Sequence, residues 1–125
     1  MSLFPTLRYR DASAAVAFLT GVLGFREGAT SRHDDGTVEH AELWCGDPPG
    51  AVLLGQLREG DAFATGRAVL HVADADPDAR HAAAVAAGAD VVMGLTDQPH
   101  GSRELALVDP EGDLWTAGTY RPQAP

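Results

Sequence analysis

The fold of this chain is decided by a stretch of sequence that occurs in it twice. The first copy, residues 11–24, reads DASAAVAFLTGVLG, and the second, residues 74–88, reads DADPDARHAAAVAAG. The opening aspartates lie 63 positions apart and the closing glycines 64. A later turn also repeats, because Asp47 and Asp109, each followed by proline, are 62 positions apart. Three landmarks at one spacing indicate that the chain is built from two copies of one unit.

Each copy of this stretch has the pattern of a helix. In the first, Phe18, Leu19 and Val22 fall on one side of a helix and form an apolar stripe. The short acidic side chains at the start can accept hydrogen bonds from free N–H groups of the first turn. The closing glycine can take the left-handed conformation that ends a helix. We expect helices over residues 12–23 and 77–87.

Strand-like segments surround both helices, one before each helix and three after it, with turn residues between them. The expected strands are residues 3–9, 26–32, 38–45 and 51–57 in the first copy and residues 67–73, 90–95, 103–108 and 114–120 in the second. Each copy is therefore a βαβββ module, module 1 at about 3–57 and module 2 at about 67–121, joined by a linker at about 58–66. We predict a single α+β domain, residues 1–125, whose modules form a cup-shaped mixed sheet with the helices on its outer face.

Composition narrows the class of protein. The formal net charge is −9, and all nine basic residues are arginine. An acidic surface repels phosphate backbones, which argues against nucleic-acid binding. No apolar run reaches the roughly 18 residues of a membrane span, and the N-terminus lacks the pattern of a signal peptide. Cys45 is the only cysteine, so no disulfide can form within the chain. We expect a cytoplasmic protein that binds neither nucleic acid nor membranes.

Several short motifs follow one another in an informative order. They are Arg8-Tyr9-Arg10-Asp11 running into residues 17–25, His40-Ala41-Glu42-Leu43, and residues 99–104, 109–115 and 118–120. With these motifs the chain resembles the vicinal-oxygen-chelate superfamily, which includes glyoxalase I, extradiol dioxygenases, fosfomycin-resistance enzymes and bleomycin-resistance proteins. The resemblance runs from Leu3 to Arg121 and implies the doubled fold. It also implies a homodimer, because such proteins commonly pair modules across chains. One fold hosts many chemistries, so the resemblance alone assigns no activity.

Metalloenzymes of this superfamily hold a divalent ion in the cup through His, Glu or similar side chains on the first and last strands of each module. The resemblance places these ligand positions at Phe4, Leu54, one residue of 67–69, and Thr116. Apolar side chains cannot coordinate an ion, arginine would repel it, and threonine is a poor ligand for zinc or iron. Gln56 and His71 are the nearest other donors, and a slip of one residue in any strand would reverse its faces. The sequence predicts no bound metal and no cofactor.

Polar residues on the expected cup face form a candidate ligand site. His40, Glu42 and Trp44 alternate along one strand and so share a face. The repeat aligns Glu42 with Glu104, and two carboxylates facing each other across the cup could bind a cationic or hydrogen-bonding ligand. His40 could titrate near neutral pH. The predicted ligand-binding residues are His40, Glu42, Trp44, Gln56, Glu104 and Thr116, and no catalytic residue is assigned.

A structural role for the two carboxylates is equally open at this point. Glu42 and Glu104 could instead form ordinary ion pairs with Arg8 or Arg103, or point to solvent.

Three functions are consistent with the sequence. The first is a metal-free small-molecule binding protein similar to bleomycin-resistance proteins, which sequesters a drug or metabolite. The second is a metal-dependent lyase, isomerase or dioxygenase with ligands displaced to His40, Glu42, Gln56, His71 or Glu104. A dimer that binds a partner and keeps a vestigial cup is a third possibility. There is no nucleophile elbow, phosphate-binding glycine loop or Cys-x-x-Cys pair, so the sequence gives no support to a serine or cysteine triad.

Overall fold

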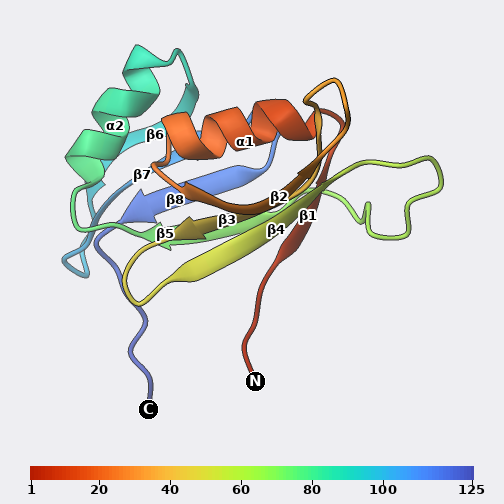
Figure 1. Cartoon of the computed structure of the whole chain (residues 1–125). Coiled ribbons are helices and arrows are strands. Elements are labelled where there is room, and N and C mark those ends of the chain that lie inside the picture. The colour runs from red at the N-terminus through yellow and green to blue at the C-terminus, as the bar shows by residue number, and fades with distance from the viewer. The chain divides into compact units, whose positions relative to one another are not determined.

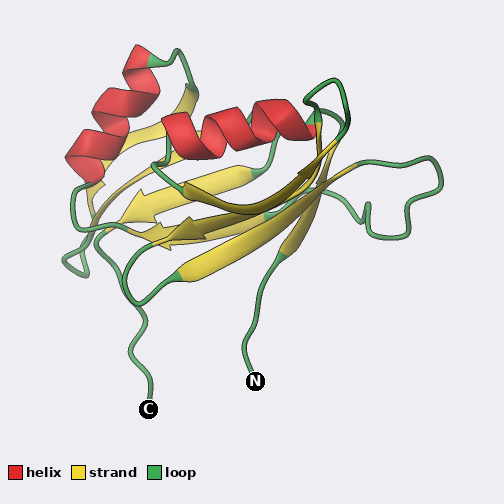
Figure 2. Cartoon of the chain, viewed as in Figure 1, coloured by secondary structure: helices red, strands yellow, loops and turns green.

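Two helices and eight strands follow one another in the order that the repeat predicts (Figures 1 and 2). A computed structural model describes all residues from 1 to 125. It separates the chain into a first unit, residues 1–68, and a second unit, residues 69–125. The first unit contains β1 (Thr6–Tyr9), α1 (Ala12–Gly21), β2 (Arg26–Arg32), β3 (Val38–Cys45) and β4 (Gly50–Gln56). The second contains β5 (Val69–Ala73), α2 (Pro77–Ala86), β6 (Asp90–Asp97), β7 (Arg103–Val108) and β8 (Leu114–Gly118).

The strands form two sheets with the same topology. The order is β1-β4-β3-β2 in the first unit and β5-β8-β7-β6 in the second. In each sheet the strand before the helix pairs in parallel with the last strand of its unit, and the remaining pairs are antiparallel. This arrangement confirms the α+β class and the two βαβββ modules. The mixed sheet consists of two four-stranded sheets, and a cup shared by both modules stays a prediction.

The predicted strands and helices are too long at several ends. Strand β1 begins at Thr6 rather than at residue 3, because Pro5 has no N–H to donate and contributes only its carbonyl, which accepts from Leu53 N at 2.9 Å. Strand β8 ends at Gly118, opposite the last residue of β5, rather than at residue 120. The helices end at Gly21 and Ala86, before the predicted residues 23 and 87.

Each helix covers one face of its own sheet. The Asp11 carboxylate accepts from Ala14 N at 3.0 Å and starts α1, and the Asp76 carboxylate accepts from Ala79 N at 3.1 Å and starts α2. Helix α1 buries Ala12, Ala15, Val16, Phe18 and Leu19 with Tyr9, Leu43 and Leu54 of the first sheet. The core of the second unit includes Val72, Ala84, Leu105, Leu107, Trp115 and Ala117. The face of each sheet without a helix is called its helix-free face below.

The outermost strands β2 and β6 share an irregularity. Pairing of β2 with β3 shifts between Glu27 and Thr30 and again before Arg32. Pairing of β6 with β7 shifts on both sides of Met93. Strand β2 and strand β6 therefore carry bulges at equivalent places in their sheets.

No helix of the chain is long and apolar enough to cross a membrane.

Candidate functional site

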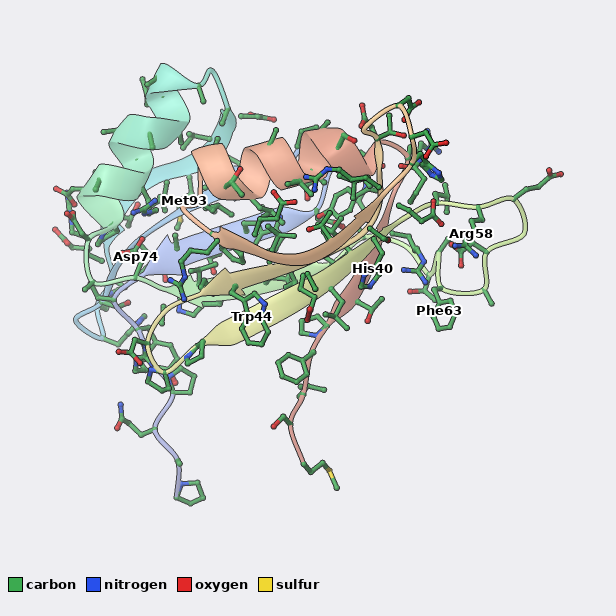
Figure 3. All side chains as sticks on the ribbon, in the orientation of Figure 1. His40, Trp44, Arg58, Phe63, Asp74 and Met93 are labelled. Atoms are coloured by element: carbon green, nitrogen blue, oxygen red, sulfur yellow. The ribbon has the colours of Figure 1, made fainter.

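Strand pairing assigns the predicted site residues of β3 to a face. Leu43 has 0% exposure and lies under α1, and the alternation along the strand puts its neighbours Glu42 and Trp44 on the helix-free face together with His40. Figure 3 shows Trp44 and His40 on the side of the first sheet away from α1. The predicted shared face of His40, Glu42 and Trp44 is therefore confirmed.

The predicted face of β4 is wrong by one residue. Leu54 is paired with Ala41, both have 0% exposure, and both lie under α1. Leu53, opposite Glu42, takes the place on the helix-free face that we assigned to Leu54. The cause is a difference in turn length. Four residues separate Cys45 from its partner Gly50, and five separate the corresponding pair at the β7–β8 turn. One residue reverses the faces of a strand.

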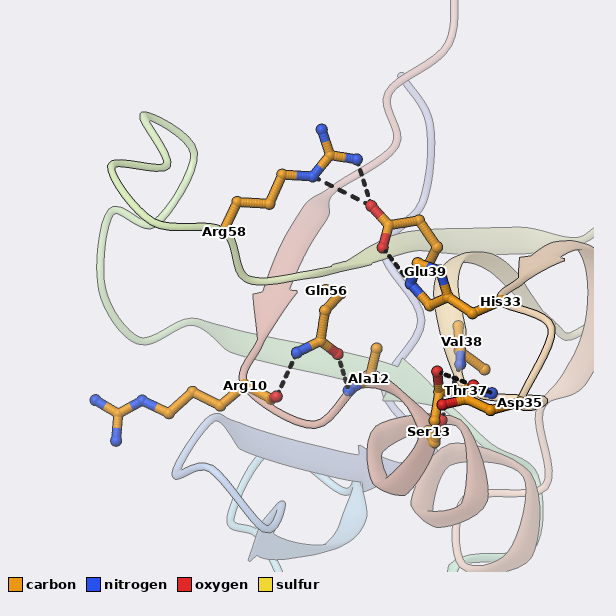
Figure 4. A network of polar contacts seen from close by, with 10 residues as sticks. All are labelled: Arg10, Ala12, Ser13, His33, Asp35, Thr37, Val38, Glu39, Gln56 and Arg58. Carbon is orange, nitrogen blue, oxygen red and sulfur yellow. Dashed lines mark hydrogen bonds and ion pairs between the residues drawn. The ribbon is translucent and has the colours of Figure 1, made fainter.

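Gln56 shares the helix side with Leu54, so its predicted place on the cup face is also wrong. Its amide oxygen accepts from Ala12 N at 3.0 Å, and its amide nitrogen donates to the carbonyl of Arg10 (Figure 4). One bond goes to the first residue of α1, and the other goes to Arg10, the residue before the Asp11 cap. Gln56 therefore holds the start of the helix, a role that satisfies backbone groups otherwise left without a partner.

The aligned pair Glu42 and Glu104 also needs correction. His40 pairs with Gly55, which pairs with Arg8, three residues before the cap of α1. Glu104 pairs with Gly118, which pairs with the residue three before the cap of α2. Glu104 is thus the counterpart of His40, two residues from the predicted match. The shift is even, so both glutamates stay on the helix-free faces of their own sheets.

The predicted ion pairs of the two glutamates are not formed. Arg8 pairs with Asp61 at 3.0 Å, and Arg103 pairs with Asp78 at 2.8 Å and with Asp97 at 3.1 Å. Glu104 accepts instead from the side-chain amide of Gln98 at 2.9 Å.

A hollow of about 180 Å³ lies in the first unit beside His40. It is lined by Arg8, Glu39, His40, Gly55, Gln56, Arg58, Asp61 and Phe63. The guanidinium of Arg8 lies against Gly55, where a Cβ would approach its Nη1 to 2.5 Å. The same guanidinium lies 4.9 Å from the centre of the Phe63 ring, within range of a cation–π contact. The hollow thus offers two arginine cations, one exposed aromatic ring and one imidazole.

The linker forms one wall of this hollow. The Asp61 carboxylate accepts from Phe63 N at 3.0 Å, and this bond, with Arg58 N–H and the charge of Arg8, holds the pKa of Asp61 below its ordinary value. Arg58 bonds Glu39 and lowers the pKa of that carboxyl, to which His33 also hydrogen-bonds at 2.9 Å (Figure 4). The segment predicted only as a connection is therefore tied to the first sheet by two ion pairs.

Two aromatic side chains meet on the first helix-free face. Trp44 is half-buried and meets Phe4 edge-on, with ring centres 6.1 Å apart and planes at 67°. A Cβ on Gly28 would come within 2.7 Å of the indole nitrogen, so the indole lies over this glycine of β2. Trp44 is thus held on two sides and presents the rest of its ring outward, as a stacking surface for a flat ligand would.

The second helix-free face carries a polar cluster. Thr116 lies on it between His71 and Ala106 in the strand register. The imidazole of His71 joins two groups: Nδ1 is 2.8 Å from the Thr116 hydroxyl, and Nε2 is 2.8 Å from the backbone carbonyl oxygen of Tyr120. Trp115, one residue away, is 1% exposed and belongs to the core.

The positions that hold a metal in related enzymes do not fit one here. With Asp76 as the cap of α2, the third position becomes Val69, and the register correction makes the second Leu53. Phe4, Leu53 and Val69 offer no donor atom, and Thr116 is already bonded to His71. No group of three His, Cys, Asp or Glu side chains is arranged to hold an ion.

Sequence reasoning missed the contribution of Arg8, Asp61 and Phe63. The pair Gly60-Asp61 does signal a turn, and the bond from Phe63 N to Asp61 is of the kind aspartate makes to a backbone group two residues on. Nothing local signals that Asp61 also reaches Arg8, 53 positions earlier in the chain.

Two βαβββ modules, each with a helix on one face of a four-stranded mixed sheet, define the class of this protein. The family model described as Glyoxalase/Bleomycin resistance protein/Dioxygenase superfamily matches residues 4–116. The chain belongs to this superfamily.

Solved structures agree with this membership. The chain is 30% identical to TioX from Micromonospora sp. ML1, with a TM-score of 0.78 over 100% of both chains. It is 22% identical to lactoylglutathione lyase from Agrobacterium tumefaciens, with a TM-score of 0.68 over 94% of this chain and 92% of that one. A glyoxylase/bleomycin resistance protein/dioxygenase domain from Frankia sp. EAN1pec is 19% identical, with a TM-score of 0.75 over 99% and 94%. The last two are similar in fold alone. No curated protein matches the chain.

Proposed function

We propose that this chain is a metal-free small-molecule binding protein of the superfamily, one that sequesters a drug or metabolite. The observation that carries the proposal is the replacement of donor atoms by apolar side chains at Phe4, Leu53 and Val69. In the first unit Trp44 is braced by Phe4 and presents its ring. A site without metal ligands but with an aromatic surface and a few polar groups suits binding better than Lewis-acid chemistry.

The proposed ligand-binding residues are His40, Glu42 and Trp44 on the helix-free face of the first sheet, and Glu104 and Thr116 on the helix-free face of the second. Gln56 leaves the predicted set because both ends of its amide are bonded at the start of α1. We further propose that the protein is cytoplasmic and acts as a homodimer. Light scattering of the full chain checks the second point, since a monomer at binding concentrations would contradict it.

Ligand binding is tested by fluorescence of the full chain. Trp115 is 1% exposed and Trp44 is half-buried on the helix-free face, so a ligand that stacks on the sheet changes the emission of Trp44. We expect a saturable change with at least one member of a panel of flat aromatic compounds and cationic glycopeptides. The change is lost in Trp44→Phe, which keeps an aromatic ring and leaves Trp115 as the matched reference. A panel without any saturable response contradicts the proposal.

Metal dependence is tested separately. Protein purified without chelator should contain less than stoichiometric zinc, nickel, manganese and iron, and addition of these ions should leave the thermal midpoint of unfolding unchanged. A stoichiometric ion that is lost in Glu42→Gln or Glu104→Gln would favour the metal-dependent enzyme with displaced ligands instead.

A further inference from the structure

The second unit holds two pairs of a hydroxyl and an imidazole, and of their four residues only Thr116 belongs to the proposed ligand-binding set. Thr116 Oγ1 lies 2.8 Å from His71 Nδ1, and Ser102 Oγ lies 2.6 Å from His100 Nε2. Both distances are within the reach that joins a nucleophile to its general base. The two pairs differ in what surrounds them, and the difference decides which of them can react.

The proton positions at His71 follow from its partners. Nε2 is 2.8 Å from the carbonyl oxygen of Tyr120, and a carbonyl oxygen only accepts, so Nε2 carries the proton of the neutral ring. Nδ1 is then the acceptor, and the Thr116 hydroxyl donates to it. The other acceptor near Thr116, the carbonyl oxygen of Leu70, is 3.5 Å away and competes poorly. A hydroxyl therefore points its proton at a base that a third group holds in place.

Access separates the two pairs. His71 is exposed and Thr116 is half-buried on the helix-free face, so an acyl compound can reach the hydroxyl oxygen. Ser102 is only 6% exposed, and His100 meets the edge of the Tyr120 ring rather than an orienting carbonyl. In the first unit the positions equivalent to His71 and Thr116 hold Thr6 and Leu53, and no such pair exists there.

We propose that Thr116 is a nucleophile that takes an acyl group from an activated ester or thioester, with His71 as its general base. Thr116 Oγ1 attacks the carbonyl carbon while its proton passes to His71 Nδ1. The bond from that carbon to the leaving oxygen or sulfur then breaks, and the leaving group takes the proton from His71. The products are acyl-Thr116 and a free alcohol or thiol, and His71 is neutral again.

The full chain treated with p-nitrophenyl acetate tests this assignment. The chain has no lysine, so the N-terminal amine is the only amine that competes, and peptide mass mapping separates it from Thr116. We expect release of p-nitrophenolate with one acetyl group on Thr116. Thr116→Val keeps the side-chain shape and abolishes that acetyl group. His71→Gln slows its formation about 100-fold, the usual contribution of a general base. Thr116→Ser retains it.

The second pair supplies matched controls. Ser102→Ala and His100→Gln should leave the acetylation of Thr116 unchanged. Circular dichroism establishes that each variant is folded before its rate is compared. Absence of an acetyl group on Thr116 overturns the proposal, and so does an unchanged rate in folded His71→Gln.

Discussion

The two units place an Asp-Pro pair at the same turn and use it differently. Asp47, between β3 and β4, is exposed. Asp109, between β7 and β8, is 5% exposed, and its carboxylate accepts from Glu111 N at 2.9 Å, Asp113 N at 3.1 Å and the Trp115 indole nitrogen at 3.1 Å. A sequence repeat therefore preserves a turn residue without preserving what that residue stabilises. The carboxylate of Asp109 connects the β7–β8 turn to the core, whereas the carboxylate of Asp47 is exposed and does not connect the β3–β4 turn to the core.

Removal of the two aspartates should give the largest difference between the units. Asp109→Ala leaves one indole N–H and two backbone N–H groups without their acceptor, so we expect the free energy of unfolding to fall by about 3 kcal/mol or more. Asp47→Ala should change it by less than about 0.5 kcal/mol, as for an ordinary surface substitution. Urea denaturation measures both values, and equal losses would refute the contrast between the turns.

The next largest difference in stability between the units should come from substitution of two equivalent glycines, Gly118 and Gly55. A Cβ on Gly118 would lie 2.5 Å from the Glu104 Cβ and 2.7 Å from the backbone oxygen of Arg103, so Gly118→Ala forces strands apart. We expect a loss of about 2 kcal/mol. At Gly55 the close atom is the end of the flexible Arg8 side chain, which can move, and Gly55→Ala should lose less than about 1 kcal/mol. If Gly55→Ala lowered the free energy of unfolding more than Gly118→Ala does, the Arg8 side chain could not move aside as expected.

The two helix starts offer a smaller contrast. Helix α1 has its own cap, Asp11, and in addition Gln56, 44 positions after Ala12, whereas α2 is started only by Asp74 and Asp76 of its own segment. Gln56→Ala should lower the free energy of unfolding by about 1 kcal/mol through its lost hydrogen bonds. Gln123→Ala, which removes an exposed glutamine from the tail, is the control and should have no measurable effect in the same urea titration.

The smallest expected effect is on the loss of stability at acidic pH. The folded pKa of Asp61 is lowered, so its contribution to stability is present above the ordinary aspartate value of about 3.9 and is lost as the pH falls through the lower folded value. Asp61→Asn should therefore flatten the acid side of the stability profile. Asp78 likewise has a lowered pKa, in its case because of Arg103, but its side chain is 60% exposed. Asp78→Asn should therefore flatten the acid side of the stability profile less than Asp61→Asn does. Acid titrations followed by circular dichroism compare the two variants.

Much of the fold could be predicted because its signals are local. Helix caps, alternating strands and turn residues gave all ten elements in order, and the alternation of His40, Glu42 and Trp44 fixed their common face. The face of β4 could not be predicted, because it depends on whether the turn before it has four or five residues, and the aligned glycines conceal that difference.

The contacts of the candidate site were harder to predict because they join distant segments. His71 meets Thr116 across 45 positions, and Arg8 meets Asp61 across 53. Each depends on the strand register or on the path of the linker, neither of which leaves a pattern in adjacent residues. The exposed polar residues were recognisable as candidates, but their partners were not.

The bulges of β2 and β6 affect how this protein behaves at high concentration. A regular outer strand offers an unbroken row of N–H and C=O groups on which a strand from another molecule can assemble. A strand whose spacing changes twice is a poor template for such growth. The β2 edge and the β6 edge are thereby disfavoured as sites of edge-to-edge aggregation.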